Sequence, residues 1–326
     1  MNLYLGIDLG GTRTKAGVVD ETGKVYSKDQ IKTQVDRDPQ AIFADIADLA
    51  ARTIASAGLT PAGITAMGLG SPGTSSNETG SIVFAGNLPA LNGWNFRSAF
   101  HQRFNLPFYL GNDANCAALA EAVAGAARGS TSSVTVTLGT GVGGGIIRDG
   151  NIDAGFNGTG SELGHMVLIA GGEPCTCGRR GCFEVYASAT ALVRETHRAA
   201  ASHPESILQK LIAENGGIAN GRTAFIGSRA GDAVAVTVVD RYLTMVAEGV
   251  ANIINFCMPE VIVLGGGVAG EGEPLLLPVR ERALNLAFLP DDVQKPGIEL
   301  ALTGNDAGII GAALMAAKNL QAGQAG

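Results

Sequence analysis

The sequence predicts an α/β protein made of two similar domains, and three observations lead to this fold class. Short apolar runs alternate with longer segments of helical periodicity, which is typical of sheets covered by helices. A pattern of strand, glycine-rich turn, strand and turn opens the chain and recurs from residue 132. The 47 glycines cluster at such turns, where backbone must bend sharply or approach a ligand closely. We therefore expect two related halves that face a cleft.

The first half consists, in chain order, of a three-stranded opening, a helix and two buried strands. The helix has Ile42, Ile46, Leu49 and Ile54 roughly at helical spacing. The last strand leads directly into a second helix, with Asp113 at or next to its N-cap. The expected elements are strands at 3–9, 15–20 and 24–29, a helix at 39–56, and strands at 64–69 and 106–110.

The second half repeats the two-strand opening and adds a long amphipathic helix. Residues 157–184, between these parts, show little periodicity. Pro259 ends the long helix, because proline cannot continue it. We expect a small domain at 1–112, completed by a carboxyl-terminal helix at about 305–326, and a large domain at 113–304. The expected elements of this half are strands at 132–138 and 145–148, a helix at 232–256, a strand at 261–264 and a final helix at about 306–318.

The composition excludes several classes of protein. A charged fraction of 16% and a hydrophobic fraction of 46% indicate a globular chain. The net charge of -7 gives no basic surface for nucleic acid or anionic lipid. The first residues lack the features of a signal peptide, and no run of about 18 apolar residues predicts a membrane span. A cytoplasmic location is expected, and in a reducing compartment the five cysteines do not indicate a disulfide framework.

The first glycine-rich turn has the composition of a phosphate-binding loop. Backbone N–H groups of such a turn converge on phosphate oxygens, and nearby hydroxyl and ammonium groups add further donors. Asp8, at the end of the preceding strand, is well placed to hold water on a magnesium ion. An ordinary hairpin turn is the competing interpretation, since such turns also favour glycine. The candidate donors are Gly10, Gly11, Thr12, Thr14 and Lys15.

Two further glycine clusters match the pattern G-x-G-x-x-G, but neither has the context of a dinucleotide site. The first is followed by a strand, whereas the dinucleotide fingerprint requires a helix. The second has no matching strand–helix–strand unit downstream of it. We interpret the first cluster as a second phosphate clamp and the second as backbone that packs against a flat base. The residues are Gly139, Thr140, Gly141 and Gly143 in the first cluster and Gly265, Gly266 and Gly267 in the second.

One short segment contains a set of zinc-type ligands with the spacing H-x9-C-x-C-x4-C. Three thiolates and one imidazole match a closed structural Zn²⁺ site. The competing interpretation is three free thiols that merely lie close in sequence. Such a set within so few residues is hard to obtain by chance, and a zinc site is therefore the prediction. The ligands are His165, Cys175, Cys177 and Cys182.

Three carboxylates accompany these motifs. Asp113 follows Asn112 at the start of a predicted helix, where helix capping is the commoner role of aspartate. Glu162 and Glu184 lie on either side of the zinc segment, and solvated surface carboxylates are the alternative for both. A rigid metal loop flanked by carboxylates suits a site that must hold sugar hydroxyls.

Together these motifs resemble those of the ROK family, named for repressors, open reading frames and kinases, and within it the bacterial glucokinase-like enzymes. GIDLGGTRTKAGVVD and TLGTGVGGGI are similar to its two phosphate motifs, and GNDAN is similar to its catalytic motif. SELGHM and CTCGRRGCFE resemble its sugar and zinc motifs, and the glycines at 265–267 its adenosine-side motif. The resemblance covers essentially the whole chain. It implies two actin-like ATPase (ribonuclease H-like) domains around a central cleft.

The resemblance also implies roles for individual residues. Asp113 would be the catalytic base, the glycine turns would bind ATP with Mg²⁺, and the four zinc-type ligands would hold a structural Zn²⁺. His165 would bind zinc through one ring nitrogen and sugar through the other. Ser161 and Ala189 stand where the family usually has glycine, and as small residues they are expected to do little harm. The implied sugar contacts are Asn87, Asn112, Asp113, Glu162, His165 and Glu184.

The expected function is ATP-dependent phosphorylation of a hexose, with the 6-hydroxyl of glucose as the leading acceptor. N-acetylmannosamine, N-acetylglucosamine, fructose and allose are alternative substrates, and polyphosphate is an alternative donor. A sugar-responsive regulator of the family would need a DNA-binding helix-turn-helix before the first phosphate strand, which begins at Leu3. An actin-like assembly or chaperone ATPase would have no use for a zinc-linked sugar motif. A homodimer is expected, because dimers are common for this architecture.

Overall fold

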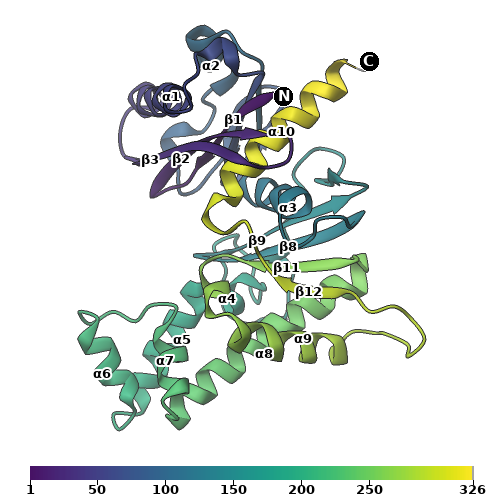
Figure 1. The fold of residues 1–326 in the computed structure, drawn as a ribbon. Helices are drawn as coiled ribbons and strands as arrows, with labels where there is room; N and C mark the ends of the chain where they lie inside the picture. The colour runs from purple at the N-terminus through teal and green to yellow at the C-terminus, as the bar shows by residue number, and fades with distance from the viewer. Residues whose placement is uncertain (325–326) are drawn as a thin grey trace. The chain divides into compact units, whose positions relative to one another are not determined.

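The computed structural model describes residues 1–324, which form two compact units (Figure 1). Unit 1 contains Met1–Ser132, Gly145–Ser161 and the chain from Leu302 onward. Unit 2 contains Ser133–Gly144 and Glu162–Ala301. The predicted small domain at 1–112 with about 305–326, and the predicted large domain at 113–304, stay predictions. In the described part of the chain, no helix combines the length and the apolar character needed to cross a bilayer.

Unit 1 is built on a mixed five-stranded sheet with the order β3-β2-β1-β4-β7. Its first three strands are antiparallel neighbours, whereas β1, β4 and β7 run parallel. In the parallel part, Asp8 pairs with Gly70, and Gly70 pairs with Gly111. The carboxyl ends of three strands therefore meet at one edge. The strands are β1 (Leu3–Leu9), β2 (Arg13–Asp20), β3 (Val25–Lys32), β4 (Ala66–Ser71) and β7 (Phe108–Asn112).

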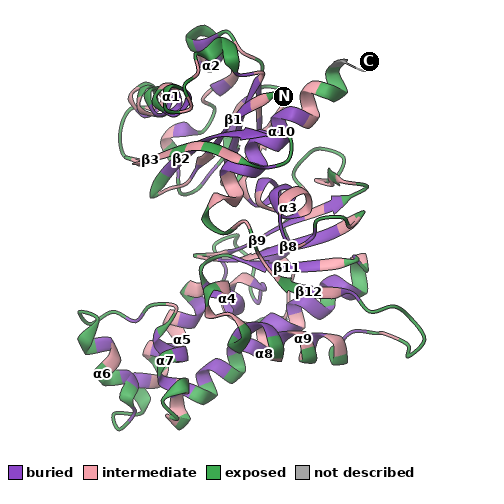
Figure 2. Ribbon diagram, in the orientation of Figure 1, coloured by how far each residue is buried: buried purple, intermediate pink, exposed green. Residues whose placement is uncertain are grey.

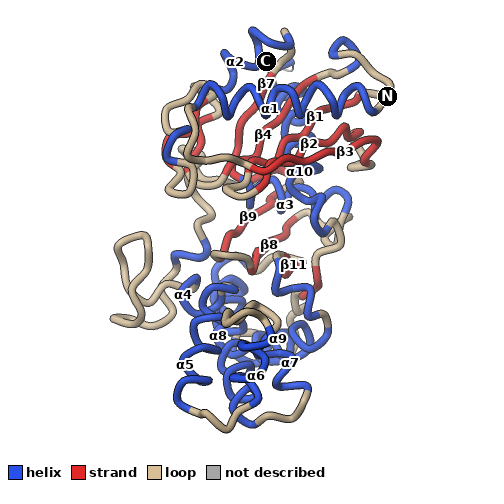
Figure 3. The backbone as a smooth tube through the Cα atoms, turned by 90° about the vertical axis from the view of Figure 1, so that its left-hand side faces the viewer, coloured by secondary structure: helices blue, strands red, loops and turns tan. Residues whose placement is uncertain are grey.

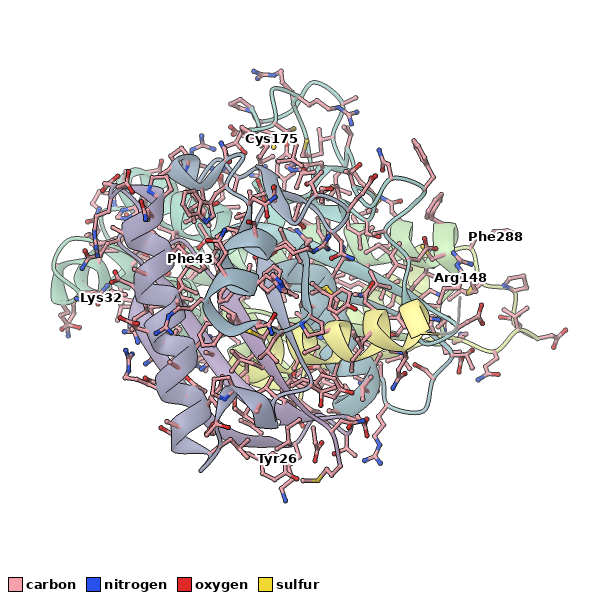
Figure 4. The ribbon with its side chains drawn as sticks, turned by 90° about the horizontal axis from the view of Figure 1, so that it is seen from above. Tyr26, Lys32, Phe43, Arg148, Cys175 and Phe288 are labelled. Carbon is pink, nitrogen blue, oxygen red and sulfur yellow. The ribbon has the colours of Figure 1, made fainter. Side chains whose placement is uncertain are left out.

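Helices cover both faces of this sheet. Helices α1 (Pro39–Ser56) and α2 (Phe96–Phe104) pack on one face, over a core that includes the stacked rings of Phe100 and Phe108. Figure 4 labels Phe43 of α1, whose ring lies 5.0 Å from that of Phe100. Helices α3 (Asp113–Ala124) and α10 (Ala307–Gln324) pack on the opposite face (Figure 1).

Helix α10 lies directly against the backbone of the sheet. A Cβ on Gly6 of β1 would come within 1.8 Å of the carbonyl oxygen of Ile309. A Cβ on Gly68 of β4 would come within 1.9 Å of the carbonyl oxygen of Ala312. Any other residue at these two positions would force the helix away from the sheet.

The second sheet has the order β10-β9-β8-β11-β12, in which β11 runs parallel to both of its neighbours. The division between the units passes through β9, whose last residues belong to unit 1. Figure 2 shows buried residues concentrated in the central strands. The strands are β8 (Ser132–Leu138), β9 (Val142–Arg148), β10 (Asn151–Ile152), β11 (Val261–Gly265) and β12 (Gly297–Leu300). A separate two-stranded sheet, β5 (Thr74–Ser76) and β6 (Ser81–Phe84), belongs to unit 1.

The helices of unit 2 pack around the long helix α8 (Figure 3). Asp232 caps its amino end by accepting a hydrogen bond from the N–H of Ala235 at 2.8 Å. Met258 ends it in the left-handed conformation, directly before Pro259. The helices are α4 (Glu184–Ala187), α5 (Ala189–Ser202), α6 (Ile207–Glu214), α7 (Thr223–Arg229), α8 (Ala233–Cys257) and α9 (Glu273–Leu286).

The α/β fold class and the expected helices at 39–56 and 232–256 are confirmed. Four expected strands end too early: those at 24–29 and 261–264 extend to Lys32 and Gly265, and two others lie at the site. The strands expected at 64–69 and 106–110 are β4 and β7, which end at Ser71 and Asn112. Glycine commonly marks a turn, yet Gly70 and Gly111 pair with each other in the parallel ladder. The extension is important for the site, because it makes Asn112 the last residue of a strand.

Several helices were not predicted. Helix α2 has its phenylalanines at positions 96, 100 and 104, so that a periodic signal was present. Helix α9 has Pro278 in its interior, and this residue disrupts the pattern by which a helix is recognised. The strand expected at 145–148 begins at Val142, because the turn before it closes within three residues.

Candidate active site

The carboxyl edge of the parallel strands in unit 1 brings Asn112 and Asp113 to the start of helix α3. Asn112 is the helix cap: its Oδ1 accepts hydrogen bonds from the N–H groups of Ala114 at 2.9 Å and Asn115 at 3.1 Å. Its amide nitrogen donates to the carbonyl oxygen of Gly73 at 3.1 Å. Capping, the alternative role considered for Asp113, is thus carried out by its neighbour.

Asp113 is the first residue of α3 and is half-buried. Its Oδ1 accepts from the N–H of Ala114 at 2.8 Å, and the positive end of the helix dipole favours its negative charge. Burial raises the pKa of the Cys116 thiol, and the carboxylates of Asp113 and Asp8 raise it further. Both carboxylates therefore lie close to the same buried sulfur.

The first glycine turn joins β1 to β2. The N–H of Gly10 donates to the carbonyl oxygen of Arg13 at 3.0 Å, which closes the turn. A Cβ on Gly11 would lie 3.4 Å from the side-chain nitrogen of Asn87, so this predicted sugar ligand lies beside the turn. Thr12 is exposed, whereas Thr14 is fully buried and shares a 2.8 Å hydrogen bond with Thr33. The structure thus brings Thr12 but not Thr14 to the surface of the turn.

Lys15 lies between the turn and the start of α10. Its Nζ is 3.6 Å from Oδ2 of Asp8 and donates to the carbonyl oxygen of Asn305 at 2.9 Å. Burial raises the pKa of the Asp8 carboxyl, and the positive charge of Lys15 opposes that rise. A Cβ on Gly308 would lie 2.4 Å from Cγ of Asp8, so the first turn of α10 packs against the carboxylate. Asn305 contributes only a main-chain carbonyl, and no sequence pattern identified it.

The second glycine turn, between β8 and β9, belongs to unit 2. It closes through a hydrogen bond from the N–H of Gly139 to the carbonyl oxygen of Gly141 at 3.0 Å. The N–H of Ala189 donates to the carbonyl oxygen of Gly139 at 2.8 Å, and the hydroxyl of Thr190 donates to the carbonyl oxygen of Thr140 at 2.7 Å. The start of α5 therefore holds this turn in place, a contact that the sequence did not reveal.

Glu184 lies against the second glycine turn. Its Oε2 accepts a hydrogen bond from the N–H of Val142 at 3.0 Å. A Cβ on Gly141 would come within 2.2 Å of the same oxygen. A residue predicted to bind sugar and a turn predicted to bind phosphate are thus in direct contact.

This contact predicts different outcomes for two substitutions in the turn. Gly141→Val is expected to raise KM for both ATP and sugar, since its side chain displaces Glu184. Gly139→Ala meets only a carbonyl oxygen at 4.0 Å and leaves Glu184 in place. It is expected to raise KM for ATP about tenfold, since added volume in a close-fitting site costs on the order of 1–3 kcal/mol, with KM for sugar unchanged. Steady-state kinetics with each substrate varied would check this, and a sugar-only effect of Gly139→Ala would contradict the phosphate role.

The third glycine cluster ends strand β11. Gly266 has a φ of 82°, and a Cβ there would come within 2.6 Å of the backbone of Leu138. A Cβ on Gly265 would meet other atoms only at 3.4 Å or more, and a Cβ on Gly267 would meet open space. The turn is thus fixed by Gly266 and leaves room beside Gly267, as a base-packing surface requires.

The predicted zinc ligands gather in unit 2, with all four ligand atoms within 4.8 Å of one another. The sulfurs of Cys177 and Cys182 are 3.7 Å apart, and Nδ1 of His165 is 3.7 Å from the sulfur of Cys175. A tetrahedral site with Zn–S bonds of about 2.3 Å requires sulfurs about 3.8 Å apart. The donor set and its spacing therefore fit a structural Zn²⁺. Figure 4 labels Cys175 in this loop.

Backbone geometry holds the loop in this form. Gly178 and Gly181 have φ angles of 87° and 80°, which favour glycine. A Cβ on Gly181 would lie 1.6 Å from the carbonyl oxygen of Ile169. The N–H of Cys175 donates to the carbonyl oxygen of Arg179 at 2.8 Å. The backbone between the ligands thus forms a tight loop that these two glycines permit.

Glu162 and His165 lie on the short segment before the zinc loop. Partial burial raises the pKa of the Glu162 carboxyl. The electrostatic effect of His165 lowers this pKa and that of Glu184 raises it, so the three side chains lie near one another. Ser161 has a φ of 66°, a left-handed conformation that favours glycine. Its hydroxyl donates to the carbonyl oxygen of Asp153 at 2.6 Å, which stabilises serine in this strained position.

Comparison with known proteins places this chain among sugar kinases. Residues 4–319 match the profile of the family described as ROK family. A glucokinase of Halalkalibacterium halodurans is 35% identical over 94% of this chain and 93% of its own length. An N-acetyl-D-glucosamine kinase of Pectobacterium carotovorum is 31% identical over 96% of this chain and 98% of its own. A ROK family glucokinase from Streptomyces griseus, solved in complex with glucose and AMPPNP, is 32% identical with a TM-score of 0.83, covering 97% of this chain and 100% of that one.

Proposed function

This chain belongs to the ROK family and is a sugar kinase, and from that premise we propose that it transfers the γ-phosphoryl group of ATP to the 6-hydroxyl of glucose. Glucose is proposed as the acceptor because the chain is similar, over nearly its whole length, to glucokinases at 35% identity. An N-acetylhexosamine is the second candidate, because kinases for such sugars are similar at about 30% identity.

We propose the following roles for the site residues. Asp113 accepts the proton of the attacking hydroxyl as the general base. The rest of phosphoryl transfer depends mainly on positioning and charge stabilisation, which the other residues supply. The sugar takes its other contacts from Asn87 and Asn112 and from the group of Glu162, His165 and Glu184. His165 turns Nδ1 toward the thiols, which leaves Nε2 for a sugar hydroxyl.

The donor phosphates are assigned to the two glycine turns. Lys15 adds a positive charge at the first turn, and Glu184 fixes the second through its hydrogen bond to Val142. Asp8 and its surrounding water would hold Mg²⁺, which neutralises charge on the β- and γ-phosphates when bound. The adenine base of ATP is assigned to the glycine turn after β11. Two further expectations, a homodimer and a cytoplasmic location, stay predictions.

An ATP-coupled assay across a panel of sugars tests the substrate. We expect kcat/KM to be highest for glucose, with N-acetylglucosamine, N-acetylmannosamine, fructose and allose all lower. A site built around hydroxyl-binding carboxylates loses paired hydrogen bonds when a hydroxyl is replaced by an acetamido group. A higher value for an N-acetylhexosamine would identify the second candidate instead. Replacing ATP with polyphosphate in the same assay decides the donor. Failure to phosphorylate any sugar of the panel would contradict the kinase assignment itself.

A further inference from the structure

Among the described residues, the most deeply buried carboxylate has no role in the proposed site. Glu121, in the third turn of helix α3, is only 1% exposed. Among the residues that the structure describes, no lysine, arginine or histidine forms an ion pair with it. A buried charge without such a partner is costly unless hydrogen bonds satisfy it, so its presence requires an explanation.

Neutral donors satisfy both oxygens of Glu121. Oε2 accepts from the N–H of Ala126 at 2.8 Å and from the N–H of Leu302 at 3.1 Å. Oε1 accepts from the N–H of Thr303 at 2.8 Å and from the hydroxyl of the same residue. Gly125 leaves the room for this arrangement, because a Cβ there would lie 2.0 Å from Oε2.

These donors fix the segment that leads into α10. Leu302 and Thr303 precede a short 3₁₀ turn, Gly304–Asp306, after which the helix begins. The carbonyl oxygen of Asn305 in that turn accepts the hydrogen bond from Nζ of Lys15. Lys15 in turn lies 3.6 Å from Asp8. A continuous set of contacts therefore runs from helix α3, through residues 302–305, to the first phosphate turn.

We infer that Glu121 is a positioning residue for nucleotide binding: by holding residues 302–305 against α3, it sets Lys15 in place beside Asp8. This inference rests on the proposed role of Lys15 in binding phosphate. Helix α3 then contributes to both parts of the site. Its first residue is Asp113, and Glu121 in its third turn positions Lys15.

The chemistry requires a carboxylate rather than an amide. The four donors need acceptor lone pairs on both oxygens. In Glu121→Gln one oxygen becomes an NH₂ group, so that two of the donors face another donor. The amide has nearly the same shape, and the substitution therefore changes hydrogen bonding without creating a cavity.

The test measures nucleotide and sugar binding separately in the full-length chain. For Glu121→Gln we expect Kd for a non-hydrolysable ATP analogue to rise about tenfold. Leaving a buried donor unsatisfied typically costs at least this factor, and residues 302–305, which hold Lys15, would shift to relieve it. Kd for glucose, measured without nucleotide, is expected to stay within about twofold. If that variant does not fold, Thr303→Val removes a single donor and is expected to act in the same direction, whereas Thr303→Ser retains the hydroxyl and wild-type affinity.

Asp20 provides a matched structural control. It is 6% exposed, and its carboxylate likewise accepts only from neutral donors, the N–H and hydroxyl of Thr22, the N–H of Lys24 and the hydroxyl of Tyr26. It lies at the far end of β2 from the phosphate turn. Asp20→Asn is therefore expected to lower thermal stability as Glu121→Gln does, but to leave the Kd for the nucleotide unchanged.

A double-mutant cycle identifies the route of the effect. If Glu121 acts through Lys15, Glu121→Gln should have little further effect on nucleotide affinity in a Lys15→Met background. Additive effects, or unchanged nucleotide affinity in both Glu121→Gln and Thr303→Val, would overturn the positioning role while leaving a working kinase. A wild-type chain that binds neither the analogue nor ATP would overturn the proposed function together with this inference.

Discussion

Replacing Asp113 with asparagine is expected to lower kcat by about 10²–10⁴-fold, the usual contribution of a general base. The amide cannot accept the proton of the sugar hydroxyl, so the phosphoryl acceptor loses its activation. Folding should be nearly intact, because Asn112 caps helix α3 and is unchanged. The lost charge at the helix start accounts for a decrease in stability of only about 0.3–1 kcal/mol. Kinetics and thermal unfolding of the same preparation would measure both effects.

Asp38 offers a matched control in the same unit. It caps helix α1, with Oδ1 accepting from the N–H of Gln40 at 2.8 Å, and it is exposed. Asp38→Asn removes the same charge from a helix start and is expected to leave kcat unchanged. Near-wild-type turnover of Asp113→Asn would show that this aspartate is not the base. A large loss of glucose affinity in that variant would instead assign it to sugar binding.

Loss of the metal loop is expected to have the second large effect. Metal analysis should find about one Zn²⁺ per chain, as a site of three thiolates and one imidazole requires. Cys177→Ser should lower zinc content and thermal stability, because a metal that binds only the folded chain stabilises it. Cys177 is exposed, so serine creates no cavity and the loss is attributable to the metal. Glucose affinity should fall, since His165 is both a ligand and a proposed sugar contact, while ATP affinity stays nearly normal.

Two further variants separate the metal from other effects. Cys257→Ser makes the same chemical change outside the cluster and should retain full zinc content. His165→Gln should weaken glucose binding even where residual zinc remains. Protein that is purified without chelators and contains no zinc would contradict the metal site. A Cys177→Ser enzyme with an unchanged KM for glucose would show that the loop does not position the sugar contacts.

The zinc ligands were predictable because their geometry is local. His165 and the three cysteines lie within one short segment, so spacing and residue type alone predict the cluster that the structure shows. The α/β class was equally accessible, because strand and helix periodicities are properties of short windows.

Features that depend on distant partners were not predictable. The ends of β4 and β7 are set by the pairing of Gly70 with Gly111, whereas the glycines alone indicate a turn. The contact of Glu184 with Val142 joins residues 42 positions apart, and the contact of Glu121 with Thr303 joins residues 182 apart. The burial of Thr14 was predictable in part. Side chains alternate along a strand, so Thr14 must face the side opposite to Lys15, but comparison with a linear motif does not take this alternation into account.

The close packing of α10 on Gly6 and Gly68 has a consequence for how the chain matures during synthesis. The strands of unit 1 are made first, but the helix that covers one of their faces is made after all of unit 2. Until then the apolar side chains on that face, such as Tyr4 and Val19, lack their native cover. The amino-terminal unit therefore completes its fold last, and a nascent chain stalled before residue 307 exposes a surface that favours chaperone binding or aggregation.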